Sequence, residues 1–440
     1  MPRSPRRWDW SSRRCRRAGP RWTRWRSCWR MASAPAIPAS IDRLRVGTPQ
    51  GDSGLLARTG EGYLFGYHAD APRSAEISLL MPQRPEQYVS RELHPIFQMN
   101  LPEGYVLERL RQRLAKATSM DPMLLLALTG REAAIGRVHV QAPAGLVEAF
   151  APGEGDGRGE RLSQILAWDG AEDLFEELAP RYLFRTGVSG VQPKLLVPEA
   201  REPDGKVSVA TVDLIVKSGG ADYPGLAVNE FVCMSIARRA GIPVPEFHLS
   251  DNRQLFVMRR FDRTADGQAL GFEEMAVLMA RGAAQKYEGS YEQVARFVSL
   301  FCSPDRRLAS LAQLFDQVAL SCILGNGDAH LKNFGVLYGD PTSEDVWLAP
   351  AYDLVNTTAY IAEDSLALTL GGSKSFFASR VHLMDFAGRC QVGDPRGRIL
   401  GLLAAVEAGM AAHAGLLAEA PVVRAGLRGA FEQFASGFVS

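Results

Sequence analysis

The hydrophobic positions of the chain follow two different periods. Residues 311–323 repeat apolar side chains at intervals of three and four, which predicts a long amphipathic helix that ends at Gly325. Residues 228–240 show the same kind of spacing and predict a second helix. Alternation with a period of two predicts strands at residues 211–217 and 254–261. The mixture of the two periods indicates an α+β fold.

The region that follows position 40 has a pattern of shorter elements. Strands are predicted at 55–67 and 77–80, and helices at 104–116 and 123–128. A stretch rich in glycine and proline comes next and is typical of a surface linker. We therefore expect a small α+β module at residues 41–145 and a linker at 146–160.

The remainder of the chain divides into a mixed part and a helical part. Residues 161–262 combine strands with the helix at 228–240, whereas residues 263–440 are mainly helical. Within the helical part, apolar and polar side chains alternate on both sides of a turn at residues 334–348, which predicts a strand pair. Closing helices are predicted at 399–417 and 423–438.

The composition limits the class of protein. A hydrophobic content of 46% supports a packed core, and no run of apolar residues is long enough for a membrane span. The six cysteines show no paired metal-ligand spacing, which favours a reducing cytoplasm. We expect a cytoplasmic protein without a membrane partner.

The net charge of +1 hides an unusual amino terminus. Residues 1–30 contain eleven arginines, no lysine and only one acid, Asp9, so the rest of the chain is acidic. A nucleic-acid-binding arm and a targeting peptide are two interpretations. We prefer a third, in which residues 1–40 are a disordered or spurious extension and Met31 is the natural start.

The strongest chemical signal is the sequence GNGDAHLKN at residues 325–333. Asp328 and Asn333 have the spacing of a kinase catalytic loop, in which an aspartate orients the attacking hydroxyl and an asparagine holds magnesium. The strand pair at 334–348 can return Asp353 to the loop as a second metal ligand, since magnesium prefers oxygen ligands. The plainer alternative is a polar surface turn.

Other residues of the loop have less certain roles. Lys332 lies between the two residues of the motif and can neutralise charge that develops on a transferred phosphoryl group. His330 is as readily a structural hydrogen-bonding group as a chemical one. With Asp328 available, the reaction does not need His330 as a base.

A lysine and a glutamate upstream form a second candidate pair. The strand at 211–217 has the pattern of one buried face and ends at Lys217, which we expect to face a cleft and to bind nucleotide phosphates. Glu230, on the helix at 228–240, is the expected acidic partner of Lys217. The alternative is two unrelated surface charges.

A glycine-containing loop precedes the strand pair. In the sequence RTGVSGVQPKLLV, Gly187 and Gly190 allow the backbone to approach a ligand, so the loop can present N–H groups to phosphates. A tight turn between two strands explains the two glycines equally well.

Taken together, GNGDAHLKNFGV, LAPAYDLV and SGVQPKLLV resemble the HipA family of bacterial serine/threonine kinases, which are the toxins of toxin–antitoxin pairs. The resemblance implies a two-lobed protein-kinase-like fold, with a mixed amino-terminal lobe and a mainly helical carboxy-terminal lobe, preceded by a small α+β module. It also implies ATP and Mg²⁺ as cofactors. Residues 285–293 match a recurrent segment of the family, to which the sequence assigns no chemistry.

The resemblance assigns residues to nucleotide binding. It implies that backbone groups near Arg259, Arg260 and Phe261 hold the adenine. The phosphate-binding loop would contain Gly187, Ser189, Gly190, Val191 and Lys194. Members of the family often autophosphorylate serines in this loop, and one such position is Gly187 here, so Ser189 remains the candidate for autophosphorylation.

The resemblance also implies partners. The expected substrate is a protein of translation, such as an aminoacyl-tRNA synthetase, whose phosphorylation arrests growth. The expected inhibitor is a small helix-turn-helix antitoxin, HipB-like, which would link the protein to DNA indirectly. Two alternatives stay open, a small-molecule kinase of the aminoglycoside or sugar type and a nucleotide-binding corepressor scaffold. Direct binding to DNA is the least expected function, because residues 31–440 are acidic overall.

Overall fold

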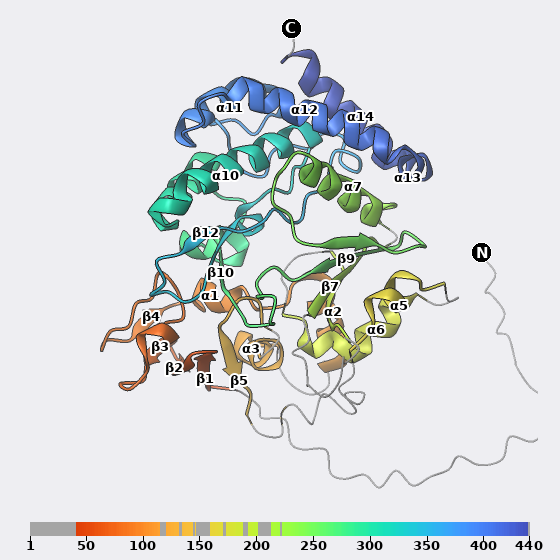
Figure 1. The fold of residues 1–440 in the computed structure, drawn as a ribbon. Helices are drawn as coiled ribbons and strands as arrows, with labels where there is room; N and C mark the ends of the chain where they lie inside the picture. Colours follow the sequence, from red (N-terminus) through yellow and green to blue (C-terminus); the bar gives the residue numbers. More distant parts are fainter. Residues whose placement is uncertain are drawn as a thin grey trace, which may run out of the picture. The chain divides into compact units, whose positions relative to one another are not determined.

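The computed structural model describes residues 41–114, 120–131, 134–143, 146, 159–169, 173–187, 192–200, 213–220 and 222–438. In these residues helices are combined with three antiparallel sheets (Figure 1). The predicted α+β fold class is therefore confirmed. The predicted amino-terminal extension and most of the linker lie outside the described residues.

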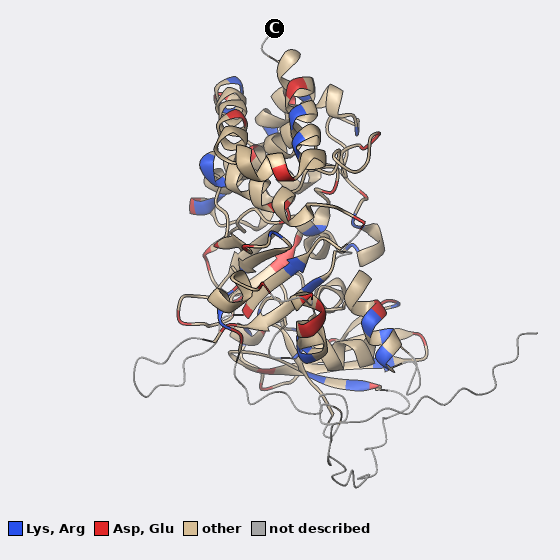
Figure 2. Cartoon of the chain, turned by 90° about the vertical axis from the view of Figure 1, so that its right-hand side faces the viewer, with Lys and Arg blue, Asp and Glu red and all other residues tan. Residues whose placement is uncertain are grey.

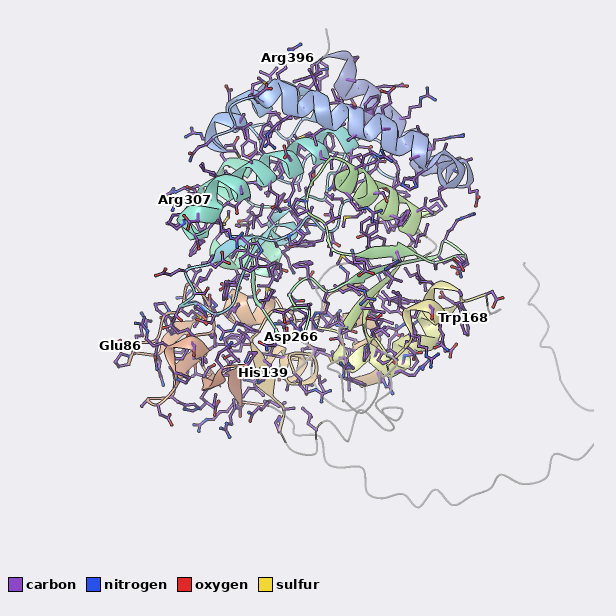
Figure 3. All side chains as sticks on the ribbon, viewed as in Figure 1. Glu86, His139, Trp168, Asp266, Arg307 and Arg396 are labelled. Atoms are coloured by element: carbon purple, nitrogen blue, oxygen red, sulfur yellow. The ribbon has the colours of Figure 1, made fainter. Side chains whose placement is uncertain are left out.

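The first sheet belongs to a unit that we call the N-terminal module, residues 41–141. Its strands, in spatial order, are β4 (Tyr88–Ser90), β3 (Gly62–Tyr67), β2 (Gly51–Thr59), β1 (Arg43–Thr48) and β5 (His139–Gln141). Its helices are η1 (Arg73–Ala75), α1 (Pro95–Gln98), α2 (Gly104–Leu114) and α3 (Pro122–Thr129). Figure 3 labels His139 on the edge strand β5.

The strand predicted at residues 77–80 is wrong, because this segment is irregular. Its backbone N–H groups bind side chains instead of a neighbouring strand. The N–H of Ile77 donates to the Tyr67 hydroxyl at 3.0 Å, and the N–H of Leu79 donates to Glu273 Oε1 at 2.8 Å. The apolar run is buried all the same, with Ile77 fully covered. The segment is buried without pairing with another strand, which explains why its apolar side chains suggested a strand.

The second sheet has the order β6 (Lys194–Pro198), β7 (Asp213–Ser218), β9 (Leu255–Arg259) and β8 (Phe247–Leu249). The prediction that β7 has one buried face was wrong, since both faces are covered. Leu214 and Val216 pack in a cluster with α5 (Leu162–Leu166) and α6 (Leu174–Tyr182), next to η2 (Leu183–Arg185). Ile215 and Lys217 are buried on the opposite face.

The helix α7 (Leu226–Arg239) covers that opposite face, packing on β7, β8 and β9 (Figure 1). It starts after Gly225, which has a left-handed backbone conformation with φ of 75°. The helix is covered on nearly all sides, and the Glu230 side chain is fully buried. Side chains fill the region between α7 and the strands (Figure 3). A charged residue in this position needs a partner, and β7 supplies it.

The centre of the carboxy-terminal part is α10 (Pro304–Leu324), whose apolar stripe is buried as predicted. It packs against α9 (Tyr291–Phe301), α11 (Phe376–Arg389), α12 (Pro395–Ala412) and α14 (Pro421–Ser436). Among the described residues, only α10 has the length and hydropathy of a membrane span, and 67% of that stretch is buried in the protein. The helix predicted at 399–417 is interrupted at His413, where α12 ends and α13 (Ala414–Glu419) follows.

The third sheet follows the loop that we call the 325–333 loop, which ends in η4 (Leu331–Asn333). Its order is β10 (Gly271–Glu274), β11 (Gly335–Tyr338) and β12 (Val346–Leu348), with α8 (Met275–Leu278) and η3 (Ala283–Gln285) after β10. The predicted strand pair is thus confirmed. Because β12 runs antiparallel to β11, it returns the chain toward Asp353.

A buried carboxylate connects the third sheet to the N-terminal module. Glu273 on β10 accepts hydrogen bonds from the Ser78 hydroxyl at 2.7 Å, from the Leu79 N–H at 2.8 Å and from the Tyr338 hydroxyl at 2.5 Å. All three donors satisfy a carboxylate that would otherwise be costly to bury. The module is therefore joined to the body by specific polar contacts.

Gly325→Ala is expected to lower the free energy of unfolding by about 1–3 kcal/mol. Gly325 has φ of 67°, and a Cβ there would lie 2.7 Å from the Thr358 hydroxyl and 2.9 Å from the Ala430 Cβ. Urea unfolding measures the change. Gly388→Ala is the matched control, because Gly388 lies in α11 with open space around it and should gain about 0.5–1 kcal/mol. Equal effects of the two substitutions would contradict the prediction.

Candidate active site

Charged side chains from separate elements meet in one cleft. Its lining includes residues of β6, β7, α7, the 325–333 loop, the segment after β12 and the N-terminal module. The cleft brings together the following site residues that the sequence predicted: Lys194, Lys217, Glu230, Arg260, Phe261, Asp328, His330, Lys332 and Asp353. These nine candidates are therefore neighbours in space, although they span much of the chain.

Lys217 forms the centre of this cleft. Its Nζ lies 2.5 Å from Glu230 Oε1 and also contacts the Asp353 carboxylate. The predicted Lys217–Glu230 ion pair is thus present, and it is buried, with 2% and 0% of the two side chains exposed. Burial by itself would lower the pKa of Lys217, but the carboxylates of Asp353 and Glu230 outweigh it and raise the pKa. Lys217 is therefore a fixed positive charge.

The two carboxylates respond to burial differently. Burial raises the pKa of Glu230 even though Lys217 opposes the change. Burial acts in the same direction on Asp353, but Lys217 and Lys194 outweigh it and lower the pKa of Asp353. Asp353 is consequently ionised, as a metal ligand must be. Its backbone has φ of 53°, which is uncommon for a residue with a side chain.

A second buried lysine lies directly across the sheet from the first. Lys194 and Lys217 are cross-strand partners in the β6–β7 ladder, and both line the cleft. Burial lowers the pKa of Lys194, and the charge of Lys217 adds to this effect, while Asp353 opposes it. Like charges opposite each other on neighbouring strands are unfavourable, and the Asp353 carboxylate, which contacts Lys217 and acts on Lys194, offsets part of this repulsion. This arrangement suits a ligand with several negative charges.

The 325–333 loop presents Asp328 at the mouth of the cleft. The Asp328 side chain is 48% exposed, and its Oδ1 accepts a hydrogen bond from the Tyr287 hydroxyl at 2.6 Å. Burial raises the pKa of Asp328, and the hydrogen bond from Tyr287 partly offsets the rise. The carboxylate can accept a hydrogen bond, or a proton, from a substrate hydroxyl group that enters the cleft.

His330 has a supporting position. Its ring packs edge-on against Tyr287, and its Nε2 is 3.9 Å from Asp328 Oδ1, beyond hydrogen-bonding distance. Burial, together with the charges of Lys286 and Lys332, lowers the pKa of His330 to about 3. The imidazole is therefore neutral near pH 7. These properties favour the structural alternative over a catalytic one.

Asn333 and Asp353 fit a magnesium ion. Both line a small cavity below the loop, and Asn333 Oδ1 is buried there without a hydrogen-bond partner among the described residues. A buried carbonyl oxygen and an ionised carboxylate in one cavity are a suitable pair of hard ligands, and a magnesium ion held there would need further oxygen ligands. The described part of the chain contains no cluster of three or more His, Cys, Asp or Glu side chains that could hold a metal ion.

Some predicted residues lie elsewhere. Gly187 is buried against the backbone oxygens of Asn100 and Thr129 in the N-terminal module, and it does not line the cleft. Arg259 lies outside the cleft lining, where it pairs with Glu199 at 2.8 Å. Ser189, Gly190 and Val191 lie outside the described residues.

Arg260 and Phe261 line the cleft in different ways. The Arg260 guanidinium is buried in a network with Asp213 and Asp262, so its side chain is committed to the fold. The Phe261 ring stacks on Tyr352, with ring centroids 5.1 Å apart, and provides an apolar wall. Such a wall suits a flat aromatic group.

Sequence reasoning missed several residues that line the cleft or contact its side chains. Lys286 and Tyr287 belong to the 285–293 segment, to which no chemistry was assigned. The segment is fastened to the 325–333 loop, because the Leu331 N–H donates to the Lys286 carbonyl at 3.0 Å and the Tyr291 hydroxyl donates to the Ala329 carbonyl at 3.1 Å. No local spacing in the sequence signals these contacts.

Two glutamates were missed as well. Glu103 comes from the N-terminal module, and its Oε1 lies 2.8 Å from Lys332 Nζ. Glu274, on β10, lines the same cleft and is 8% exposed. Burial raises the pKa of Glu274 to about 7, with Lys332 opposing and Glu103 adding to the rise.

These features define a kinase-like protein, with a lysine–glutamate pair in a mixed lobe and an aspartate-bearing loop below it. Two family models match the chain, "HipA N-terminal domain" at residues 44–141 and "HipA-like C-terminal domain" at residues 186–414. The second match covers more than half of the chain. The chain belongs to the HipA-like family.

Curated relatives agree with this assignment. "Putative kinase Y4dM" of Sinorhizobium fredii is 30% identical over 321 residues, which cover 68% of this chain and 71% of the relative. A second protein of that organism, "Putative kinase Y4mE", is 28% identical over 66% of this chain and 70% of its own length.

A solved structure supports the fold. HipA of Shewanella oneidensis MR-1, in a complex of a toxin–antitoxin system with HipB and operator DNA, matches with a TM-score of 0.61. The match covers 89% of this chain and 97% of the other at 19% identity. At this identity the likeness establishes the shared architecture.

Glu274→Gln is expected to stabilise the protein more at pH 7.5 than at pH 5. A carboxyl group whose pKa rises from 4.5 to about 7 on folding destabilises the folded state as the pH rises through that interval. The increase in the free energy of unfolding should be about 2–3 kcal/mol larger at pH 7.5 than at pH 5. Urea unfolding at the two pH values measures it. Glu407→Gln, at an exposed position of α12, is the control and should show no such difference. A gain that is independent of pH would refute the prediction.

Proposed function

We propose that this protein is an ATP- and Mg²⁺-dependent serine/threonine protein kinase of the HipA toxin type. One observation carries the proposal. The buried Lys217 holds both Glu230 and Asp353, in the same cleft as Asp328. Phosphoryl transfer depends mainly on positioning and charge neutralisation, and this set of residues provides both.

Each residue has a distinct role in the proposal. Asp328 accepts a hydrogen bond from the substrate serine or threonine hydroxyl and takes its proton as this oxygen receives the phosphoryl group. Tyr287 holds the Asp328 carboxylate in place. Lys194 and Lys217 bind the phosphates, while Asn333 and Asp353 would hold magnesium. The bound metal would supply positive charge at the phosphate oxygens. Lys332 adds a further positive charge beside the loop.

The nucleotide base has a less specific site. Phe261 and Tyr352 form an apolar wall that can cover the adenine. The proposed hydrogen bonds come from the backbone of Arg260 and Phe261, which line the cleft, whereas the Arg259 N–H already donates to the Glu246 carbonyl at 2.9 Å. The proposed phosphate loop retains Ser189, Gly190 and Val191 with Lys194, and Ser189 remains the proposed autophosphorylation site. Gly187 is better explained as a packing position, because any side chain there would meet the module backbone.

The biological role follows from family membership. We propose that the substrate is a translation protein, such as an aminoacyl-tRNA synthetase, and that phosphorylation arrests growth. The inhibitor would be a helix-turn-helix antitoxin, since the Shewanella HipA is complexed with HipB and operator DNA. In the view of Figure 2, acidic and basic positions of the described chain are interspersed, which favours an indirect link to DNA. The described cysteines are free and buried, which suits a cytoplasmic location.

Incubation with magnesium and ATP, followed by intact mass analysis, tests the proposed activity. Protein that begins at Met31 should gain one phosphate, mapped near Ser189, or transfer phosphate to a translation protein. Asp328→Asn, which keeps the shape of the side chain without its charge, should reduce transfer at least 100-fold and retain nucleotide binding. Transfer to an aminoglycoside or a sugar alone would support the small-molecule alternative. Nucleotide binding without any transfer would support the corepressor scaffold.

Tyr287→Phe is expected to lower the rate of phosphoryl transfer by about 10-fold, because Asp328 Oδ1 loses the hydroxyl donor that lies 2.6 Å away and becomes less well oriented. Nucleotide affinity should change by less than about twofold, since the lost group does not touch the phosphate-binding lysines. The rate under saturating nucleotide measures the first effect. Tyr223→Phe, at an exposed position, is the control. An unchanged rate would show that Tyr287 does not orient Asp328.

A further inference from the structure

The N-terminal module contributes residues to the catalytic cleft. Met99, Glu103 and Ile135 of the module line it together with the kinase-like residues. Glu103 lies immediately before α2, next to Gly104, whose φ of 49° turns the chain into the helix. This turn directs a carboxylate of the module toward the 325–333 loop, which is more than two hundred residues away in sequence.

Glu103 binds the charged end of Lys332. The distance from Lys332 Nζ to Glu103 Oε1 is 2.8 Å, and only 7% of the lysine side chain and 23% of the glutamate side chain are exposed. The backbone beneath the lysine is also fixed, because the Tyr352 hydroxyl donates to the Lys332 carbonyl at 2.7 Å. Lys332 is therefore held from both ends.

The contact places a negative charge where the proposed function requires phosphates. The Glu103 carboxylate shares the cleft with Lys194, Lys217 and Lys286. The nearly buried Glu274 lines the same cleft, where the charge of Lys332 acts on it. A carboxylate in a phosphate-binding cleft repels phosphates, and it also occupies the ammonium group that could bind them. The flexible stem of a lysine allows its charge to exchange one anionic partner for another.

We propose that Glu103 is a positioning residue through which the N-terminal module sets the affinity of the cleft for polyphosphate. In the free protein, Glu103 holds Lys332 on the module side of the cleft. When a nucleoside triphosphate binds, Lys332 leaves Glu103 for the phosphates, and the cost of this exchange lowers the affinity. This inference rests on the proposed function, because it requires that the cleft bind a nucleotide.

Binding of three ligands to the full-length protein tests the proposal. The ligands are adenosine, ADP and a non-hydrolysable ATP analogue, the last two with magnesium, and calorimetry gives each Kd. Glu103→Gln should tighten binding of the triphosphate analogue by about fivefold and of ADP by a smaller factor, and leave adenosine unchanged, because the repulsion grows with the number of phosphates. Lys332→Gln should weaken the triphosphate most and leave adenosine unchanged.

Two controls separate this effect from a structural one. Glu108→Gln removes a charge from the exposed face of α2 and should change none of the three affinities. Thermal unfolding identifies any variant that is not folded, and Glu103→Ala is a second variant with the same expected direction. A uniform change for all three ligands would indicate a structural role and overturn the proposal.

The possible failures are distinguishable. If the wild type binds the triphosphate and Glu103→Gln binds it equally or more weakly, the proposal is wrong and the proposed kinase function stands. If the wild type binds no nucleotide at all, both are wrong.

Discussion

The structure of the cleft depends on one buried positive charge. Lys217 is almost fully covered, and an unpaired ammonium group in that environment would be strongly destabilising. Its two carboxylates come from different elements, Glu230 from α7 and Asp353 from the segment after β12. The ion pairs therefore require that α7 and this segment both dock against β7. The same contacts that neutralise the lysine also assemble the proposed phosphate and metal sites.

The 325–333 loop is positioned by contacts from outside its own sequence. The left-handed Gly325 ends α10 and directs the chain into the loop, while Lys286 and Tyr291 bind its backbone from the 285–293 segment. Tyr287 and Glu103 bind its charged side chains. Support from several directions fixes the loop more precisely than its own short turns could, which the proposed phosphoryl transfer requires.

The N-terminal module is part of the same assembly. Its contact with Glu273 lies in a buried region, and its contact with Lys332 lies in the cleft itself. A change in the position of the module would consequently alter the charge balance around the loop. The family models treat the two regions as separate domains, yet the polar contacts join them into one site.

The sequence by itself determined the elements that short-range patterns control. It predicted α10 and its end at Gly325 and the strand pair that returns Asp353, because helical and strand periods are local properties. The pairing of Lys217 with Glu230 was expected on a different ground, since a phosphate-binding lysine needs an acidic partner. Only the tertiary structure decided the positions of Glu103, Glu274 and Tyr287, the packing of Gly187 against the module and the irregular course of residues 77–80. These features depend on contacts between residues far apart in the chain, and on burial that leaves no periodic signal. Packing of separate elements creates such contacts, so no single stretch of sequence contains them.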